Sequence, residues 1–253
     1  MSQIERAGFS LYYETDGSGP PVLLTHGFAA TSRMWRGQAK AFDLRHQLIT
    51  WDMRGHGRSS SPTQQSSYSV EETVDDIKAL LDALDHEHAV IGGHSLGGYM
   101  SLAFYMKYPE RVRALLLIDT GPGYKSDSPR DEWNEMVSGL SRRLKRDGLD
   151  HLKKLSREMD PSEHRSAVGL ARAALGMLIQ RDSVMIDSLS EISVPTLVLV
   201  GEKDRSYLAA SKYMADKIPG AEQIVIPNAG HAVNFHQPER FNEAVGAFLA
   251  RIK

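Results

Sequence analysis

The sequence predicts an α/β fold of three layers, in which a mostly parallel central sheet lies between two layers of helices. Short apolar runs of strand length alternate along the chain with segments in which apolar residues recur every three or four positions. Most of these runs are apolar throughout, as is typical of strands covered on both faces of a parallel sheet. This alternation favours helices on both faces of the sheet. The chain of 253 residues is long enough for one large domain of this kind.

Seven segments have the pattern of a strand. The first alternates apolar and polar residues, whereas the others are short apolar runs. They are residues 9–14, 22–24, 48–51, 89–91, 115–118, 196–200 and 224–226. Because the carboxyl ends of parallel strands meet at one edge of a sheet, we expect the functional loops at that edge.

Three helices are predicted in most detail. The first begins after Ser69, which has the spacing of a capping box with Glu72, and its apolar stripe extends to Leu84. Another helix follows Ser95. The last begins near Pro238, since proline is favoured in the first turn of a helix. Its apolar stripe comprises Phe241, Val245, Phe248 and Ile252.

The alternation is interrupted between residues 124 and 190. This interval has helical patterns but no strand-like run, so we predict a helical insertion there and assign residues 1–123 and 191–253 to one core domain. The insertion carries nearly equal numbers of basic and acidic residues. Its basic run, residues 142–146, is therefore predicted to be a solvated helix face rather than a binding patch.

Composition and charge exclude several classes of function. The formal net charge is −2 with both signs mixed along the chain, which predicts no attraction to nucleic acid or to an anionic membrane. The absence of cysteine excludes disulfides, thiolate metal sites and a cysteine nucleophile. The histidines show no metal-ligand spacing, and no glycine-rich segment matches a dinucleotide-binding fingerprint. We therefore expect no metal and no cofactor.

The terminal segment and the length of the apolar runs bear on location. The segment from Met1 to Arg6 lacks the apolar core of a signal peptide, and no apolar run approaches the length of a membrane span. We expect a cytoplasmic protein whose partner is a small molecule. The sequence does not distinguish a monomer from a homodimer.

Residues 93–97, Gly-His-Ser-Leu-Gly, are the candidate centre of a chemical site. They lie between an apolar run and a predicted helix, the context in which a Gly-x-Ser-x-Gly sequence forms a sharp turn with the serine at its apex. The two glycines allow the strand and the helix to approach closely. Ser95 is thus a candidate nucleophile. The alternative interpretation is a serine that caps an ordinary helix.

A serine hydroxyl needs a base to accept its proton and an acid to orient that base. Asp204 and His231 both follow predicted strands, so a parallel sheet would bring them to the same edge as Ser95. We predict that His231 is the base and Asp204 the acid. Asp119 also follows a strand and is the alternative acid.

With these residues in the order Ser, Asp, His, the chain resembles the α/β-hydrolase superfamily over nearly its full length. Supporting segments are His26-Gly27-Phe28, residues 52–59 and Gly97-Gly98. The resemblance is to a branch with a serine nucleophile and a helical cap, which includes carboxylesterases and enol-lactonases. It implies an α/β-hydrolase fold with residues 124–190 as the cap. We expect His26 to brace loops rather than to contact substrate.

The resemblance also implies the roles of the site residues. Ser95 would attack the carbonyl carbon of an ester, His231 would take the proton of its hydroxyl, and Asp204 would hold the imidazole. The backbone N–H groups of Phe28 and Leu96 would form the oxyanion hole. The implied function is hydrolysis of a small carboxylic ester through an acyl-enzyme.

Other activities of the same superfamily are separated by single residues. Epoxide hydrolases and haloalkane dehalogenases use aspartate where this chain has Ser95, so those activities are disfavoured. His94 and Ala232 stand where carbon–carbon bond hydrolases commonly carry asparagine and tryptophan, which weighs against that activity without excluding it. An enol-lactone substrate stays open, as does a non-catalytic or slow-turnover receptor for a small ligand.

Apolar residues of the insertion are candidates for the walls of a substrate pocket. We select Tyr124, Trp133 and Met136 first, and methionine in such walls suits ligands of varied shape. The alternative for each residue is packing between the helices of the cap. Further candidates in the same segment are Leu140, Leu175, Met177, Leu178 and Met185.

Overall fold

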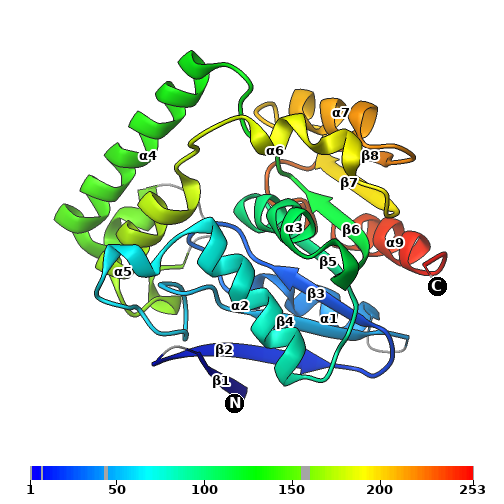
Figure 1. Ribbon diagram of the computed structural model, residues 1–253, viewed down its shortest axis with the longest axis horizontal. Helices are drawn as coiled ribbons and strands as arrows, with labels where there is room; N and C mark the ends of the chain where they lie inside the picture. Colours follow the sequence, from blue (N-terminus) through cyan, green and yellow to red (C-terminus); the bar gives the residue numbers. More distant parts are fainter. Residues whose placement is uncertain (1, 7, 43–44, 155–159, 253) are drawn as a thin grey trace.

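The computed structural model describes residues 2–6, 8–42, 45–154 and 160–252. Its centre is an eight-stranded sheet with helices on both faces (Figure 1). The strand order is β1-β2-β4-β3-β5-β6-β7-β8. Strand β2 pairs antiparallel with β1 and β4, and the other neighbours are parallel. The predicted three-layer α/β fold with a mostly parallel sheet is confirmed.

All seven predicted strands are present, and β1 is an additional one. The strands are β1 (Ser2–Arg6), β2 (Phe9–Asp16), β3 (Pro21–Thr25), β4 (Gln47–Trp51), β5 (Ala89–His94), β6 (Val112–Ile118), β7 (Thr196–Gly201) and β8 (Glu222–Ile226). Strand β1 lies at the edge of the sheet, where it pairs with β2 through its main chain and is mostly exposed. Because Ile4 is its only apolar residue, the sequence carries no strand pattern there.

The helices of the core cover the two faces of the sheet in separate sets. They are η1 (Ser32–Trp35), α1 (Arg36–Phe42), η2 (Gln65–Ser67), α2 (Val70–Ala83), α3 (Leu96–Lys107), η3 (Pro109–Arg111), α7 (Leu208–Lys217), α8 (Val233–His236) and α9 (Pro238–Leu249). Helices α2, α3 and α7 lie on one face, and α1 and α9 on the other (Figure 1). Within β3, Leu23 packs toward the first set, whereas Val22 and Leu24 pack toward the second. None of the described helices is both long and apolar enough to cross a lipid bilayer.

The predicted helix signals have the expected geometry. Ser69 Oγ accepts a hydrogen bond from the N–H of Glu72 at 3.1 Å, which satisfies one of the amide groups at the start of α2. Helix α9 begins at Pro238, and Phe241 is among its buried residues. Ile252 lies beyond the end of this helix and is half-buried.

Between β6 and β7 the described residues form helices and loops without a further strand, as the sequence pattern predicts. These helices are α4 (Asp127–Asp147), η4 (Gly148–Lys154), η5 (Pro161–Glu163), α5 (Ala167–Ala173), the π-helical turn η6 (Ala174–Leu178), α6 (Val184–Asp187) and η7 (Leu189–Glu191). In Figure 1 the long helix α4 stands apart from the layers of the sheet, and it packs against α5 and η6. We call residues 124–190 the inserted segment.

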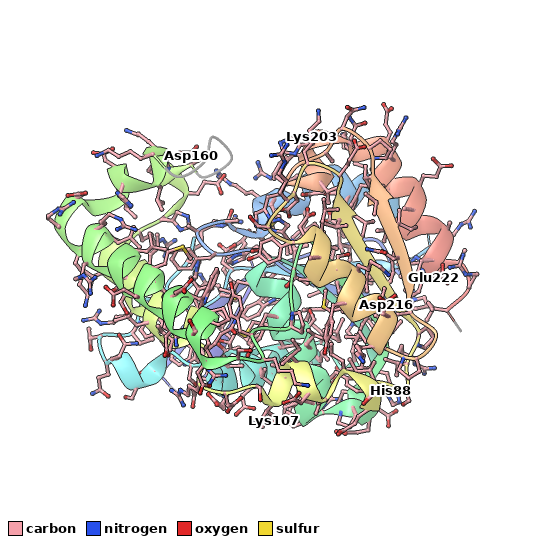
Figure 2. All side chains as sticks on the ribbon, turned by 90° about the horizontal axis from the view of Figure 1, so that it is seen from above. His88, Lys107, Asp160, Lys203, Asp216 and Glu222 are labelled. Carbon is pink, nitrogen blue, oxygen red and sulfur yellow. The ribbon has the colours of Figure 1, made fainter. Side chains whose placement is uncertain are left out.

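Charged side chains of both signs surround the core. Figure 2 shows Lys203, Asp216 and Glu222 pointing outward from the region of β7, α7 and β8, and all three are exposed. This distribution agrees with the mixed charge of the sequence, because neither sign dominates that part of the surface. A cluster of charged residues of one sign is therefore a local feature of this protein.

Candidate active site

Ser95 lies at the turn that joins β5 to α3. Its backbone has φ 52° and ψ −114°, a left-handed conformation that is strained for a residue with a side chain. A Cβ on Gly93 would collide with the main chain of Gly97, and a Cβ on Gly97 would collide with the carbonyl of Thr25. Glycine is therefore required at both positions. Ser95 makes no capping hydrogen bond to α3, which argues against the helix-cap interpretation.

The structure places Asp204 and His231 together. Asp204 follows β7 and its side chain is buried, whereas His231 follows β8 and its side chain is 44% exposed. The ring N–H at Nδ1 of His231 donates to Asp204 Oδ2 at 2.8 Å. His231 and Ser95 line the same cavity. Residues that are far apart in the sequence thus meet at the carboxyl ends of β5, β7 and β8, as parallel topology requires.

Asp119, the alternative acid, has different partners. Its carboxylate accepts hydrogen bonds from the N–H groups of Gly201 at 2.9 Å and Val233 at 3.1 Å. Burial raises the pKa of Asp119 to about 7, while the two N–H donors act in the opposite direction. Asp119 therefore joins the loops that carry Asp204 and His231, and Asp204 is the carboxylate that bonds to Nδ1 of the imidazole.

The N–H group of Phe28 is oriented through the carbonyl of Gly27, which belongs to the same peptide unit. The carbonyl of Gly27 accepts hydrogen bonds from His26 Nδ1 at 2.7 Å and from the N–H of Ala30 at 3.1 Å. His26 Nε2 accepts from the N–H of Met53 at 3.0 Å, which fixes the proton on Nδ1. Burial lowers the pKa of His26 to about 4, so the ring is neutral near pH 7. The histidine braces two loops, in agreement with the role expected from its position.

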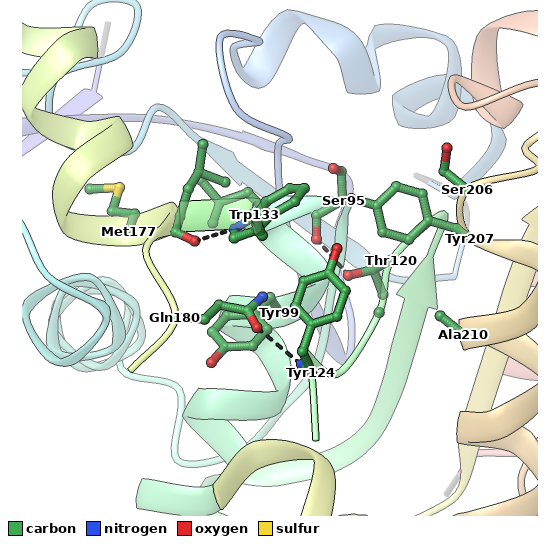
Figure 3. Close-up of a pocket in the computed structure, with 14 residues that line it drawn as sticks. Ser95, Tyr99, Thr120, Tyr124, Trp133, Met177, Gln180, Ser206, Tyr207 and Ala210 are labelled. Atoms are coloured by element: carbon green, nitrogen blue, oxygen red, sulfur yellow. Dashed lines mark hydrogen bonds between the residues drawn. The ribbon is translucent and has the colours of Figure 1, made fainter. Parts of the chain in front are cut away.

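The N–H group of Leu96 is held in a similar way. The carbonyl of Ser95, in the same peptide unit, accepts from Thr120 Oγ1 at 2.6 Å (Figure 3) and from the N–H of Gly98 at 3.0 Å. Because a peptide is planar, a fixed carbonyl also fixes the direction of its N–H. Among the described residues, neither Phe28 nor Leu96 has a hydrogen-bond acceptor for its N–H. Two oriented donors are therefore available beside the serine.

His94 holds the loop that carries His231 by a hydrogen bond to its main chain. Its Nε2–H donates to the carbonyl oxygen of His231, and the two rings lie 4.7 Å apart between centroids. Burial lowers the pKa of His94 to about 3, which keeps the ring neutral. The variable position of the Gly-x-Ser-x-Gly sequence thus positions the main chain of the candidate base.

Tyr207 is a site residue that the sequence reasoning missed. Its ring stacks on that of His231, with centroids 4.9 Å apart and planes 20° apart. It lines both cavities beside Ser95, and its N–H donates to the carbonyl of Asp204 at 3.0 Å. Figure 3 shows Tyr207 and Ser95 side by side. No motif marks this tyrosine, since its place depends on the course of the loop after β7.

Two cavities meet at Ser95. The larger, of about 740 Å³, is lined by Phe28, His231 and the core-facing side of α4. The smaller, of about 110 Å³, is lined by Leu96, Thr120 and part of the inserted segment (Figure 3). Residues common to both walls are Ser95, Trp133, Leu178 and Tyr207. The serine is therefore accessible from two sides.

The candidate pocket residues lie on these walls. Tyr124 lines the smaller cavity, Met136 the larger one, and Trp133 both. The indole N–H of Trp133 donates to the carbonyl of Leu178 at 2.6 Å, which fixes the ring between the cavities. Of the further candidates, Leu140, Met177 and Leu178 also line a cavity, whereas Leu175 and Met185 line neither. Met185 packs against the hydrophobic core instead, as its alternative interpretation predicts.

The basic run of the inserted segment is divided by its helical geometry. Arg142 and Arg146 are exposed and pair with Glu135 and Asp147 on the surface, as a solvated face would. Arg143 differs, because it is half-buried and lines the larger cavity. It follows Met136 and Leu140 at helical spacing on the same face of α4. The charge of the run does not distinguish Arg143 from its exposed neighbours, so the sequence did not indicate that this residue lines a cavity.

The site therefore offers a serine hydroxyl, an imidazole held by a carboxylate, and two oriented N–H donors. These are the groups that acyl transfer to a serine requires. Among the described residues, no three histidine, aspartate or glutamate side chains are arranged to hold a metal ion.

Comparisons with known proteins agree with this fold. A family model described as alpha/beta hydrolase fold matches residues 20–153. The chain is 28% identical to the pimeloyl-acyl-carrier-protein methyl ester esterase of Nitrosomonas europaea, over 92% of this chain and 96% of that one. It is 30% identical to the solved structure of a thermophilic esterase from Thermogutta terrifontis, with a TM-score of 0.82 and 99% of both chains covered.

A third relative has a different printed activity. Est816, described as an N-acyl homoserine lactone degrading enzyme, is 30% identical, with a TM-score of 0.75, and the match covers 98% of this chain and 100% of that one. The family model alone spans more than half of the sequence. The chain therefore belongs to the alpha/beta hydrolase fold family and is an enzyme of the hydrolase class.

Proposed function

We propose that this protein is a serine esterase that hydrolyses a small carboxylic ester through an acyl-enzyme intermediate. The observation that carries the proposal is the 2.8 Å hydrogen bond from His231 to Asp204, beside a serine held in a strained turn. That bond places the ring proton on Nδ1 and the lone pair on Nε2, the nitrogen that serves as a base. The similarity to two esterases supports the same reaction class.

In the first half of the reaction, Ser95 Oγ attacks the carbonyl carbon while His231 takes the hydroxyl proton. The negative oxygen of the tetrahedral intermediate accepts hydrogen bonds from the N–H groups of Phe28 and Leu96. Asp204 stabilises the positive charge that the imidazole acquires. His231 then gives its proton to the leaving alcohol, and the acyl group stays on the serine.

In the second half, water attacks the acyl-enzyme with His231 as the base, and Ser95 is restored when the carboxylic acid leaves. The same two N–H donors stabilise the second tetrahedral intermediate. Loss of one such donor typically costs about 3 kcal/mol of transition-state stabilisation. The hydrogen bonds from His26 and Thr120 therefore contribute to rate through the peptide units that they orient.

We further propose that the inserted segment acts as a cap that shapes the substrate site. The two cavities then hold the two arms of the ester. Because the leaving alcohol receives its proton from His231, which lines the larger cavity and not the smaller one, the alcohol arm belongs in the larger cavity. The smaller cavity of about 110 Å³ suits a short acyl group.

A lactone is a second candidate substrate. In a lactone the acyl and alcohol arms are joined, and the two cavities share walls at Trp133, Leu178 and Tyr207, so a joined substrate would span them. The similarity to the N-acyl homoserine lactone degrading enzyme favours testing this class beside linear esters.

The test is turnover of p-nitrophenyl acetate and butyrate by the parent protein and by Ser95→Ala. We expect the variant to lose at least about 10⁴-fold in kcat. Ser138→Ala is the matched control, because this serine of α4 lines neither cavity. Thermal unfolding shows whether both variants are folded.

Equal rates for the parent and a folded Ser95→Ala variant would contradict the proposal. A single turnover with retained product would instead indicate a slow-turnover receptor.

A further inference from the structure

The larger cavity has apolar walls and a cationic rim. Its apolar residues include Met34, Met136, Leu140 and Phe235. Besides its histidines, His94, His231 and His236, the acidic and basic residues that line it are Arg33, Arg36, Arg143 and Glu163. Three arginines and one glutamate thus lie among the described residues of this wall. Since the whole chain has a net charge of −2, this positive charge is a local feature.

The single carboxylate is already engaged. Glu163 pairs with Arg33 at 3.2 Å, and its other oxygen accepts a hydrogen bond from the hydroxyl of Thr31. The pair of Arg33 and Glu163 is therefore neutral as a unit. Arg36 and Arg143 supply the remaining charge of the rim.

Arg36 and Arg143 have no ion-pair partner among the described residues. This contrasts with Arg142, the next residue along α4, which pairs with Glu135 at 2.7 Å. The guanidinium of Arg143 lies over Gly139, with Nη1 only 3.1 Å from where a Cβ would stand, so glycine leaves room for it. The two unpartnered arginines come from α1 of the core and α4 of the inserted segment.

Such an arrangement suits an anion on an apolar arm. A guanidinium binds a carboxylate through paired, charge-assisted hydrogen bonds, and these are stronger beside an apolar wall than in open water. We propose that the arm of the ester in the larger cavity carries a carboxylate, which Arg36 and Arg143 bind. This inference rests on the proposed esterase function and names its substrate class: a short-chain ester with an apolar, carboxylate-ended arm.

The kinetic test compares charged and neutral forms of the same ester. One pair is the acetyl ester of p-hydroxyphenylpropanoate and its methyl ester, with the charge on the alcohol arm. The other is mono-p-nitrophenyl glutarate and its methyl ester, with the charge on the acyl arm. Phenol release gives the ratio of kcat/KM for the anionic form to that for the neutral form.

We expect this ratio to fall about fivefold or more in Arg36→Gln and in Arg143→Gln for one of the two pairs, mainly through KM. The ratio for the parent should also fall as NaCl is raised, because salt screens the rim. Arg142→Gln is the matched control and should keep the parent ratio. A response in the acyl-arm pair would support the carboxylate site and reverse the assignment of the two arms.

Binding separates this inference from the proposed function. Calorimetry with p-hydroxyphenylpropanoate and the Ser95→Ala variant requires no turnover, and adding Arg36→Gln should raise Kd about fivefold. Unchanged ratios in both ester pairs, with Ser95-dependent cleavage intact, would overturn the carboxylate site alone. If no ester is cleaved, the binding measurement decides. An unchanged Kd in the Arg36→Gln variant would then overturn the carboxylate site as well. A raised Kd would support the carboxylate site and refute only the esterase proposal.

Discussion

The core and the inserted segment contribute different parts of the site. Ser95, Asp204 and His231 all follow strands of the core, and main-chain hydrogen bonds of neighbouring strands and loops fix their positions. The inserted segment contributes walls instead, among them Trp133 and Met136. Under the proposed function, the strand ends of the sheet supply the chemistry, and the helices of the inserted segment determine which molecule reaches it.

The two regions are joined beside the loop that carries Phe28. His164 of the inserted segment accepts from the N–H of Gly57 at 3.1 Å, and its other ring nitrogen donates to the carbonyl of Ala29 at 3.0 Å. The Thr31 hydroxyl also donates to Glu163 of the same segment. These contacts connect the inserted segment to the loop that carries Phe28. Under the proposed function, most substitutions in the segment that leave these contacts intact should alter selectivity more than rate.

The largest effect on kcat is expected from substitution of Asp204, the proposed catalytic acid in the core. Asp204→Asn should lower kcat for p-nitrophenyl acetate by about 10⁴-fold, because an amide no longer stabilises the proton on Nδ1 of His231. Asp119→Asn should cost less than about tenfold in kcat and lower the Tm, since its carboxylate holds two loop N–H groups. Steady-state kinetics and thermal unfolding of both variants test this. The opposite ranking would identify Asp119 as the catalytic acid.

The core should also lose stability in acid. Burial lowers the pKa of His26 to about 4 and that of His94 to about 3, below the usual 6.5. At these two rings the unfolded chain therefore binds more protons than the folded one between about pH 6.5 and 4, which lowers the free energy of unfolding as pH falls. Asp119, whose pKa is raised to about 7, acts in the opposite direction over this window, but one carboxyl offsets only part of the effect of two imidazoles. Each unit of pKa difference is worth about 1.4 kcal/mol.

Urea unfolding at several pH values across this window measures the slope. His94→Asn should have a shallower slope than the parent, because one buried histidine is removed. An equal slope in the parent and in His94→Asn would show that this ring is protonated in the folded state.

A smaller effect on kcat is expected for Thr120, a core residue that orients the N–H of Leu96 through the carbonyl of Ser95. Thr120→Val removes the hydroxyl that holds the carbonyl of Ser95 and should lower kcat about tenfold with KM unchanged. Thr120→Ser keeps the hydroxyl and should restore most of the rate. If Thr120→Val and Thr120→Ser behave alike, Thr120 acts through packing and not through orientation of Leu96 N–H.

The smallest effect on rate is expected in the inserted segment. Met136→Ala enlarges the larger cavity and should shift the preference among alcohol chain lengths by about two- to fivefold, with little change in kcat for the smallest ester. Met185→Ala is the control, because this residue of the same segment lines neither cavity. A loss of kcat in Met136→Ala as large as that in Asp204→Asn would break the division between the two regions.

Much of the core could be predicted because its signals are local. Apolar runs marked six strands and alternation marked a seventh, and the two glycines of the Gly-x-Ser-x-Gly motif indicated the sharp turn at Ser95 on steric grounds. Asp204 and His231 could be placed beside the serine because parallel topology gathers strand ends. Strand β1 could not be predicted, since main-chain pairing at an edge leaves no apolar pattern.

The rest of the site depends on packing between distant segments. Tyr207 joins the site only because the loop after β7 turns its ring onto His231. Arg143 lines a cavity while Arg142 is exposed to solvent, a difference of one helical position within a mostly basic run. Trp133 lines both cavities, and its ring is held by a hydrogen bond to Leu178, 45 residues further along the chain.

The most direct test of the central claim is labelling with a fluorophosphonate, followed by identification of the modified peptide. If the core alone sets the chemistry, one equivalent of probe should attach to Ser95, the labelling rate should collapse in His231→Ala, and Met136→Ala should label within a few-fold of the parent. Labelling of a different serine, or no labelling of the folded parent protein, would contradict the account.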